Sequence, residues 1–262
     1  MNPTSGGRAP PGTPNLAASA AVRHVHFCLT CPNRGVALQA LRQVTAERCE
    51  SEHKTVHGRL EYRMTMPRSR KFDENSLLDA AIELFWVHGY AATSLAQVST
   101  ATGVTNGSLY QAYGSKRALF LAAYRKYCAQ RVAIVADVFT RERPGIEQAV
   151  TAYFDAIVAN CAAHADRRGC LMLNTISELG TDPDIADISS ATVDAMEDAV
   201  AEGLCRVVPR SADAADITVS AAQIVALSQA LIQLSRMGRD HAALRRIGAQ
   251  SAAATERLLQ AA

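Results

Sequence analysis

The sequence predicts an all-α fold for most of this 262-residue chain. Beyond residue 72, apolar residues recur at spacings of three and four, which is the period of an amphipathic helix. Capping residues and glycines separate these runs, and no run alternates apolar and polar residues as a half-buried strand does. We expect three regions, residues 1–65, 66–120 and 121–262.

Residues 1–65 have a composition that resists packing. Five of the nine prolines lie here, in a Ser/Gly/Pro-rich opening, and they are Pro3, Pro10, Pro11, Pro14 and Pro32. Segments of this kind bury too little apolar surface to offset the entropy lost on ordering. Only Arg8 precedes the short apolar run 16–22, so no secretion signal is expected. We interpret residues 1–65 as a disordered extension, or as the result of a start assigned upstream of the true one at Met66.

A metal site in this segment is a sharper alternative. Its candidate ligands have the spacing of a zinc site, and they are Cys28, Cys31, Cys49, His53 and His57. The gap between Cys31 and His53 is longer than a compact finger uses, and few apolar residues are available to pack around an ion. We therefore predict no metal and no cofactor. The cysteines beyond residue 72 are interpreted as small buried thiols.

The first helix is expected from Asp73, a good N-cap, to Gly89, a typical stop. One face of this helix carries apolar residues at helical spacing together with a histidine, and we expect that face to be buried. Its members are Leu77, Ala81, Leu84, Phe85 and His88.

Two short helices joined by a tight turn follow. Ser94 and Gln97 have the spacing of a capping box, and Gly103 suits the left-handed turn that ends the first of the two helices. The apolar residues Leu95, Val98 and Ala101 are expected to face inward. A helix pair joined in this way is typical of a DNA-reading helix-turn-helix.

The second short helix combines an apolar anchor with exposed polar groups. Thr105 is its expected N-cap, and Leu109 and Ala112 are placed to pack inward. The polar side chains, suited to base edges and phosphates, are Asn106, Ser108, Tyr110 and Gln111. A β-hairpin or a glycosylation site at residues 106–108 fits poorly, because the flanks do not alternate as paired strands would and nothing upstream resembles a secretion signal. An ordinary helix pair within a larger core stays open.

A further helix begins after the break at 114–115, with Ser115 as its cap, and runs from Lys116 through Tyr124. From these residues and motifs, the run from about Asp73 to Tyr124 resembles the N-terminal domain of the tetracycline-repressor (TetR) family of bacterial transcription regulators. The resemblance implies a three-helix reading head and a fourth helix that leads to an all-helical ligand-binding and dimerisation domain. It also implies repression that a small molecule relieves.

The resemblance assigns roles to individual positions of this chain. Thr93 and Lys116 match positions that hold phosphates, and Tyr110 and Tyr113 match aromatic residues at phosphates or at the groove edge. Positions that face the major groove match Thr105, Asn106, Gly107, Ser108 and Gln111. Asn106 departs from the family pattern, which often has lysine there, so the preferred operator sequence does not follow from the resemblance.

Charge agrees with an anionic partner. Residues 66–131 carry eight Lys or Arg against four Asp or Glu, so their net charge is +4, whereas the whole chain has +2. Such an excess favours nucleic acid, although solvated basic faces are common. We expect no apolar stretch of the roughly 20 residues that cross a membrane, which predicts a cytoplasmic protein without a membrane partner.

No catalytic motif supports an enzyme. The chain has no Gly-x-Ser-x-Gly elbow, no Gly-x-Gly-x-x-Gly or phosphate-binding loop and no His-Glu-x-x-His pair. We therefore expect a non-enzyme that binds a double-stranded DNA operator, most simply a repressor released by an inducer of unknown identity. A helical interaction module is the alternative.

The second half of the chain predicts five helices. They are expected near 145–163, 169–180, 182–207, 213–237 and 240–259. Asp182 and Pro183 mark one start, because proline is favoured in the first turn of a helix. In the resembled family the last two long helices form a homodimer interface, so we expect a homodimer, although an apolar stripe is more often a domain's own core.

An inducer is expected to bind among residues 145–207. Cys170, Met172 and Asn174 supply soft or polar groups among aliphatic residues, as a small-molecule pocket requires. Each of them has an ordinary structural interpretation as well. A thiol or metal sensor that uses Cys161, His164 and Cys170 is a second possibility.

Overall fold

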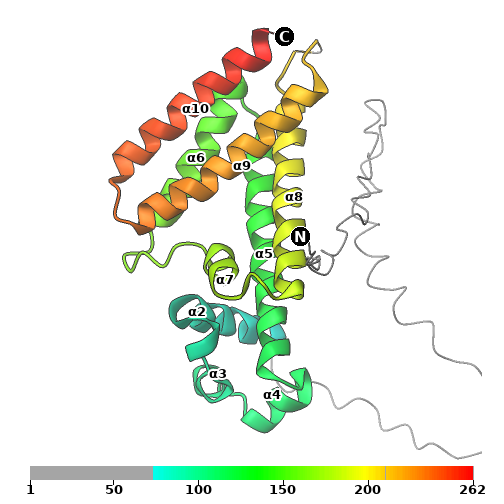
Figure 1. The fold of residues 1–262 in the computed structure, drawn as a ribbon, viewed down its shortest axis with the longest axis vertical. Helices are drawn as coiled ribbons and strands as arrows, with labels where there is room; N and C mark the ends of the chain where they lie inside the picture. The colour runs from blue at the N-terminus through cyan, green and yellow to red at the C-terminus, as the bar shows by residue number, and fades with distance from the viewer. Residues whose placement is uncertain (1–72, 210, 262) are drawn as a thin grey trace, which may run out of the picture. The chain divides into compact units, whose positions relative to one another are not determined.

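The computed structural model describes residues 73–209 and 211–261, which belong to one compact unit, residues 67–262 (Figure 1). In these residues the regular structure is entirely α-helical. The predictions made for residues 1–65, including the zinc ligands Cys28, Cys31, Cys49, His53 and His57 and a start at Met66, lie outside the described residues.

Four helices come first. They are α2 (Glu74–Ala92), α3 (Leu95–Thr102), α4 (Asn106–Tyr113) and α5 (Lys116–Thr140). We call α2, α3, α4 and the first two turns of α5 the head. Five helices follow, and they are α6 (Ile146–Ala162), α7 (Leu171–Leu179), α8 (Pro183–Cys205), α9 (Ala214–Arg236) and α10 (His241–Ala261). We call these five helices and the rest of α5 the body.

The predicted helix starts are confirmed in the head. Each of its four helices has a side chain that accepts a hydrogen bond from a backbone N–H of the first turn, and these caps are Asp73, Ser94, Thr105 and Ser115. The predicted capping box is present, because the Ser94 Oγ accepts from the Gln97 N–H and the Gln97 Oε1 accepts from the Ser94 N–H at 2.7 Å. Gly103 ends α3 in the left-handed region, with φ 69°.

Two inward-facing assignments in the head were wrong. His88 and Ala101 are exposed, whereas Ile82 and Trp86 are buried. The regular part of α2 ends at Gly89, where φ is 79° and ψ is 172°, and one more turn follows to Ala92. The buried face of α2 therefore lies about one residue away from the predicted stripe.

The described residues contain two apolar cores. One joins the head to α7 and the start of α8, with Phe85, Leu109 and Met172 among its members. The other joins the second half of α5 to α6, α8, α9 and α10. Helix α5 runs through both, as Figure 1 shows, so the predicted division at residue 120 falls within a continuous helix. Helix α7 shares its core with the head although it follows α6 in the chain.

Helix α9 contradicts the expectation that no apolar stretch is long enough to cross a membrane. It has 23 residues and a mean hydropathy of 1.5 over its most apolar window, of which 39% is buried here. By length and composition alone it could span a bilayer. This is weak evidence, because a core helix of a soluble protein passes the same test, and α9 contributes Ile224, Val225 and Leu231 to the second core.

Candidate DNA-binding surface

The inner face of α4 anchors this short helix on the head. Leu109 is 1% exposed and shares the first core with Leu95, Val98 and Val104. A helix of eight residues is not stable alone in water, so this packing and its caps hold it in place. The orientation of the outer face is therefore fixed by the rest of the head.

The outer face of α4 presents the predicted groove-facing residues to solvent. Asn106, Gly107 and Gln111 are exposed, and Tyr110 is 56% exposed. An aromatic side chain left in water on a polar face is the kind of group that contacts a nucleic acid by its ring and its hydroxyl. These four residues lie on one helix within six positions of each other, so the structure brings them together as predicted.

Gly107 has no structural reason to be glycine within the described residues. Its φ is not positive, and a Cβ built on it would meet no atom within 4 Å. Glycine in a helix costs up to about 1 kcal/mol relative to alanine. A surface that needs its backbone to come close to another molecule explains such a glycine.

The N-terminus of α4 is built by two hydroxyl groups. The Thr105 Oγ1 accepts from the Ser108 N–H at 3.2 Å, and the two side-chain oxygens are 3.0 Å apart. Thr105 is exposed and Ser108 is half-buried. The first turn of a helix presents free N–H groups and the positive end of the helix dipole, both of which favour a phosphate.

Tyr113 and Lys116 lie where α4 meets α5, and both contact other parts of the head. The Tyr113 hydroxyl donates to the Glu74 carboxylate at 3.2 Å. The Lys116 Nζ donates to the Ala91 carbonyl at 3.2 Å and lies 4.4 Å from the centroid of the Tyr90 ring. Lys116 therefore places a positive charge beside the end of α2, at the edge of the surface that α4 forms.

Thr93 differs from the other predicted DNA contacts because its side chain is buried. It is 1% exposed, and its hydroxyl donates to the Gly89 carbonyl at 2.7 Å. This bond closes the turn between α2 and α3. In this structure the Thr93 hydroxyl has a packing role and faces away from the exposed surface, so the predicted phosphate contact would need another group of the same turn.

Sequence reasoning missed the contacts that join the head to the body. The Glu178 carboxylate, on α7, accepts from the Tyr90 N–H at 3.0 Å and from the Ala91 N–H at 2.8 Å. These amide groups are available because the helix breaks at Gly89, which removes their usual carbonyl partners. Helix α7 thus holds the last turn of α2, directly before the helix-turn-helix.

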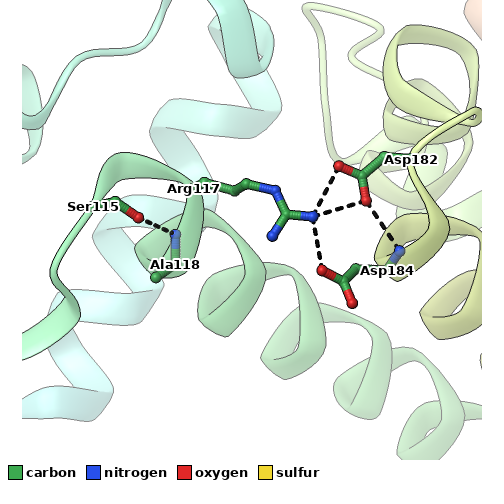
Figure 2. Close-up of polar contacts among 5 residues, drawn as sticks. All are labelled: Ser115, Arg117, Ala118, Asp182 and Asp184. Atoms are coloured by element: carbon green, nitrogen blue, oxygen red, sulfur yellow. Dashed lines mark hydrogen bonds and ion pairs between the residues drawn. The ribbon is translucent and has the colours of Figure 1, made fainter.

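A second contact joins the start of α5 to the start of α8. Figure 2 shows the Arg117 guanidinium between Asp182 and Asp184, with its Nη2 at 2.9 Å and 2.7 Å from their carboxylate oxygens. Asp182 also accepts from the Asp184 N–H as the N-cap of α8. The hydrogen bond from Arg117 lowers the pKa of Asp182. Arg117 adjoins Lys116, so one of two neighbouring cations is neutralised by the body.

A third contact joins α2 to the loop after α6. The Arg168 Nη1 pairs with the Glu83 carboxylate of α2 at 2.5 Å, and its Nε pairs with Asp166 at 2.9 Å. The Arg168 guanidinium lies 5.1 Å from the centroid of the Trp86 ring. Its partners are separated in sequence by up to 85 residues, so no local pattern indicates the pairing.

The three residues predicted to bind an inducer all contact other residues of the protein. Cys170 and Met172 are buried in the first core, and the Cys170 Sγ accepts from the Tyr127 hydroxyl. The Asn174 amide donates to the Arg168 carbonyl at 2.8 Å and accepts from the Arg236 guanidinium. Their role in ligand binding stays a prediction. A hollow of about 240 Å³, counting space open to solvent, is lined instead by residues of the end of α6, the loop after it and the end of α9.

The structure separates the three residues of the predicted sensor. Cys161 and His164 line this hollow, whereas Cys170 is in the core. Burial raises the pKa of the Cys161 thiol, which lowers its thiolate fraction at neutral pH and hence its reactivity. Across residues 73–209 and 211–261, no three His, Cys, Asp or Glu side chains gather as metal ligands.

Comparison with known proteins assigns the family. Residues 77–123 match the family model described as "Bacterial regulatory proteins, tetR family". The HTH-type transcriptional repressor ComR of Escherichia coli K12 is 40% identical over 125 residues, which are 47% of this chain and 58% of ComR. The chain thus matches less than two thirds of that relative.

Two further matches extend the similarity into the body. The uncharacterised HTH-type regulator YezE of Bacillus subtilis 168 is 33% identical over 143 residues, 54% of this chain and 73% of YezE. The structure of a cysteine mutant of the TetR family regulator CifR, complexed with 26-base-pair operator DNA, shares the fold. Its TM-score is 0.57 with 24% identity, and the match covers 72% of this chain and 99% of that chain. This chain therefore belongs to the TetR family of bacterial transcription regulators.

Proposed function

We propose that the protein binds a double-stranded DNA operator through α4 and represses transcription there. The observation that carries the proposal is the outer face of α4, where exposed polar residues, a glycine open to solvent and a helix N-terminus lie together on a rigid head. The relative ComR is named a repressor, and a structure of CifR is complexed with operator DNA, which supports this function. DNA binding would place the protein in the cytoplasm.

Within this function the residues divide into two roles. Base edges in the major groove would meet Thr105, Asn106, Gly107, Ser108 and Gln111, whose positions line the outer face of α4. Phosphates would meet Tyr110, Tyr113 and Lys116 at the edge of that face, with Thr93 supporting the turn behind it. Phosphate contacts fix position and base contacts give sequence preference, so the two groups are separable by experiment.

The protein would act as a homodimer, because each chain supplies one head and a palindromic operator needs two. Helices α9 and α10 support this, since apolar side chains on both remain exposed in one chain, with Val219 at 52%, Ile247 at 39% and Leu258 at 45%. A partner that covers these residues removes apolar surface from water. Sedimentation of a monomer, both free and on DNA, would contradict the proposal.

A small-molecule effector would release the operator, as is typical of the family. A ligand shifts such an equilibrium only by the difference between its affinities for the two states, about 1.4 kcal/mol for each tenfold change. The contacts of Glu178, Arg117 and Arg168 give the body three connections to the head through which such a difference could act.

Fluorescence anisotropy with DNA from upstream of the protein's own gene tests the proposal. We expect saturable binding that weakens as salt rises, and a Lys116→Ala variant whose affinity falls similarly on all sequences. The same variant should lower the slope of log affinity against log salt by about one, because it removes one positive charge from a phosphate. Equal affinity for this DNA and for random DNA would contradict operator binding.

A further inference from the structure

The hollow between the loop after α6 and the end of α9 has an unusual lining. Three of its residues are arginines, and they are Arg167, Arg168 and Arg236. His164, Asn160 and Ser235 supply polar groups, and no Asp or Glu lines it. A concave surface lined by one sign of charge concentrates ions of the opposite sign.

The charges of these arginines are unequally balanced. Arg168 pairs with two carboxylates, Glu83 and Asp166. Within the described part of the chain, Arg167 and Arg236 form no ion pair, and the Arg236 guanidinium donates only to the neutral amide of Asn174. The hollow is therefore lined by two exposed arginines that have no ion-pair partner among the described residues, and an anion bound there would supply one.

The backbone is shaped to bring these side chains together. Arg167 is the non-glycine residue with a positive φ in the described residues, at 52°, a conformation that costs free energy in an arginine. The Arg167 Nη1 lies 2.7 Å from the position that a Cβ on Gly238 would take. The Arg236 Cδ lies 3.1 Å from the position that a Cβ on Gly169 would take. Two glycines thus leave the space in which two of the arginines lie.

We propose that this hollow binds a small anion carrying a carboxylate or phosphate group, and that this anion is the effector of the regulator. The proposal deepens the proposed function, and its effector role rests on it. The hollow is open to solvent and encloses little more than the space of one water molecule, so it suits a single carboxylate or phosphate group and not a bulky ligand. Arginine suits this role because its planar fork of donors matches both carboxylate and phosphate.

Arg168 connects the hollow to the DNA-binding head. It lines the hollow while its Nη1 pairs with Glu83 and its guanidinium covers Trp86, both on α2. An anion in the hollow competes with Glu83 for the same guanidinium. Because the Arg168–Glu83 pair joins α2 to the body, its loss changes how the head is held. By linkage, operator DNA then weakens anion binding by the same factor.

Direct binding is measured first, without DNA. The full-length protein is melted in rising sodium phosphate and, separately, sodium acetate, each against sodium chloride at equal ionic strength. We expect a saturable rise in Tm with at least one anion, which also shows whether phosphate or carboxylate is preferred. The rise should be lost in Arg167→Gln/Arg236→Gln and kept in the charge-matched Arg239→Gln/Arg246→Gln, whose residues are exposed and outside the hollow.

Equal responses in the two double variants, or no saturable response to either anion, would overturn the site. The effector role is tested separately by operator affinity at saturating anion. We expect a loss of about 5- to 150-fold, the usual range of such couplings, in the wild type and none in Glu83→Gln. Anion binding without any change in operator affinity would overturn the effector role alone. Absent operator binding would instead refute the proposed function and leave the site established by the melting data.

Discussion

The outer face of α4 and the junction between head and body are built in different ways. At α4 the determining contacts are local, as between Thr105 and Ser108, three residues apart. At the junction the partners are distant, as between Glu178 and Tyr90, 88 residues apart, or Arg117 and Asp182, 65 apart. The reading surface is thus set by a short sequence, whereas its placement on the body depends on the whole fold.

The two regions also differ in how easily they can change. Exposed ion pairs each contribute about 0–1 kcal/mol, because water screens them. The pairs of Arg117 with Asp182 and Asp184 are largely exposed, so they can be exchanged without unfolding the protein, whereas Glu83 is exposed but its partner Arg168 is mostly buried. The core beneath α4 is apolar and buried, so changes there are expected to destabilise the head. Regulation is therefore expected at the junction, and recognition on α4.

The largest effect is expected on the buried side of α4. Leu109→Ala leaves a cavity beneath the helix and should lower the free energy of unfolding by about 2–5 kcal/mol. Gln111→Ala, on the exposed side of the same helix, should change it by less than about 0.5 kcal/mol. Urea unfolding followed by circular dichroism compares them, and similar losses in both would mean that α4 has no distinct inner and outer face.

The next effect concerns the junction. Glu178→Gln replaces a carboxylate that accepts two backbone hydrogen bonds with a neutral amide, which weakens both. We expect about 1–2 kcal/mol less protection, or roughly 5- to 30-fold faster hydrogen exchange, at the Tyr90 and Ala91 amides. Glu142→Gln, also exposed, is the control. Unchanged exchange at both amides would show that α7 does not hold the end of α2.

A smaller effect has opposite signs in stability and in function. Gly107→Ala should stabilise the head by at most about 1 kcal/mol, because the added methyl group meets open space. The same methyl group should weaken operator binding if the backbone of α4 approaches DNA closely. Thermal unfolding and anisotropy on the same sample test both signs, and a variant that is more stable and binds equally well would remove Gly107 from the interface.

The smallest effect is the pH dependence of the pair between Arg117 and Asp182. The pKa of Asp182 is lowered in the folded state, first by its hydrogen bond with Arg117, so this contribution to stability is full at neutral pH. It is lost as the pH falls below about 4, through the folded pKa. Asp182→Asn should therefore differ from the wild type at pH 7, and the difference should shrink as the pH falls below about 4. A constant difference over this range would exclude the ion pair as its cause.

The caps of the helices could be predicted from the sequence because their partners are three residues away, as for Ser94 and Gln97. Which face of a helix is buried is harder to predict, and His88 was expected to face inward because one histidine at apolar spacing fits either side of a narrow stripe. Met172 and Asn174 were candidates for a pocket because soft and polar groups among aliphatics suit a core and a pocket equally.

The junction could not be predicted for a different reason. Arg168, Glu178 and Asp182 have polar side chains near loops, and such residues are usually solvated. The packing of α7 against α2 and of α8 against α5 brings them near their partners, and that packing follows from apolar contacts between residues far apart in the sequence. The local sequence pattern therefore predicted the exposed polar face of α4, but not the interactions that hold the head on the body.

The proposal that α4 reads the operator is tested most directly with the double variant Asn106→Ala/Gln111→Ala. The measurement compares its affinity for operator DNA with its affinity for random DNA. Both residues are exposed and outside the core, so the fold should be retained, and Gln148→Ala/Gln250→Ala is a control with two amides elsewhere on the surface. If these amides read base edges, the difference between the binding free energies for operator and random DNA should shrink by about 1–3 kcal/mol for each amide removed from a base, while the affinity for random DNA stays the same. An unchanged difference in a folded double variant would contradict the claim that α4 reads the operator.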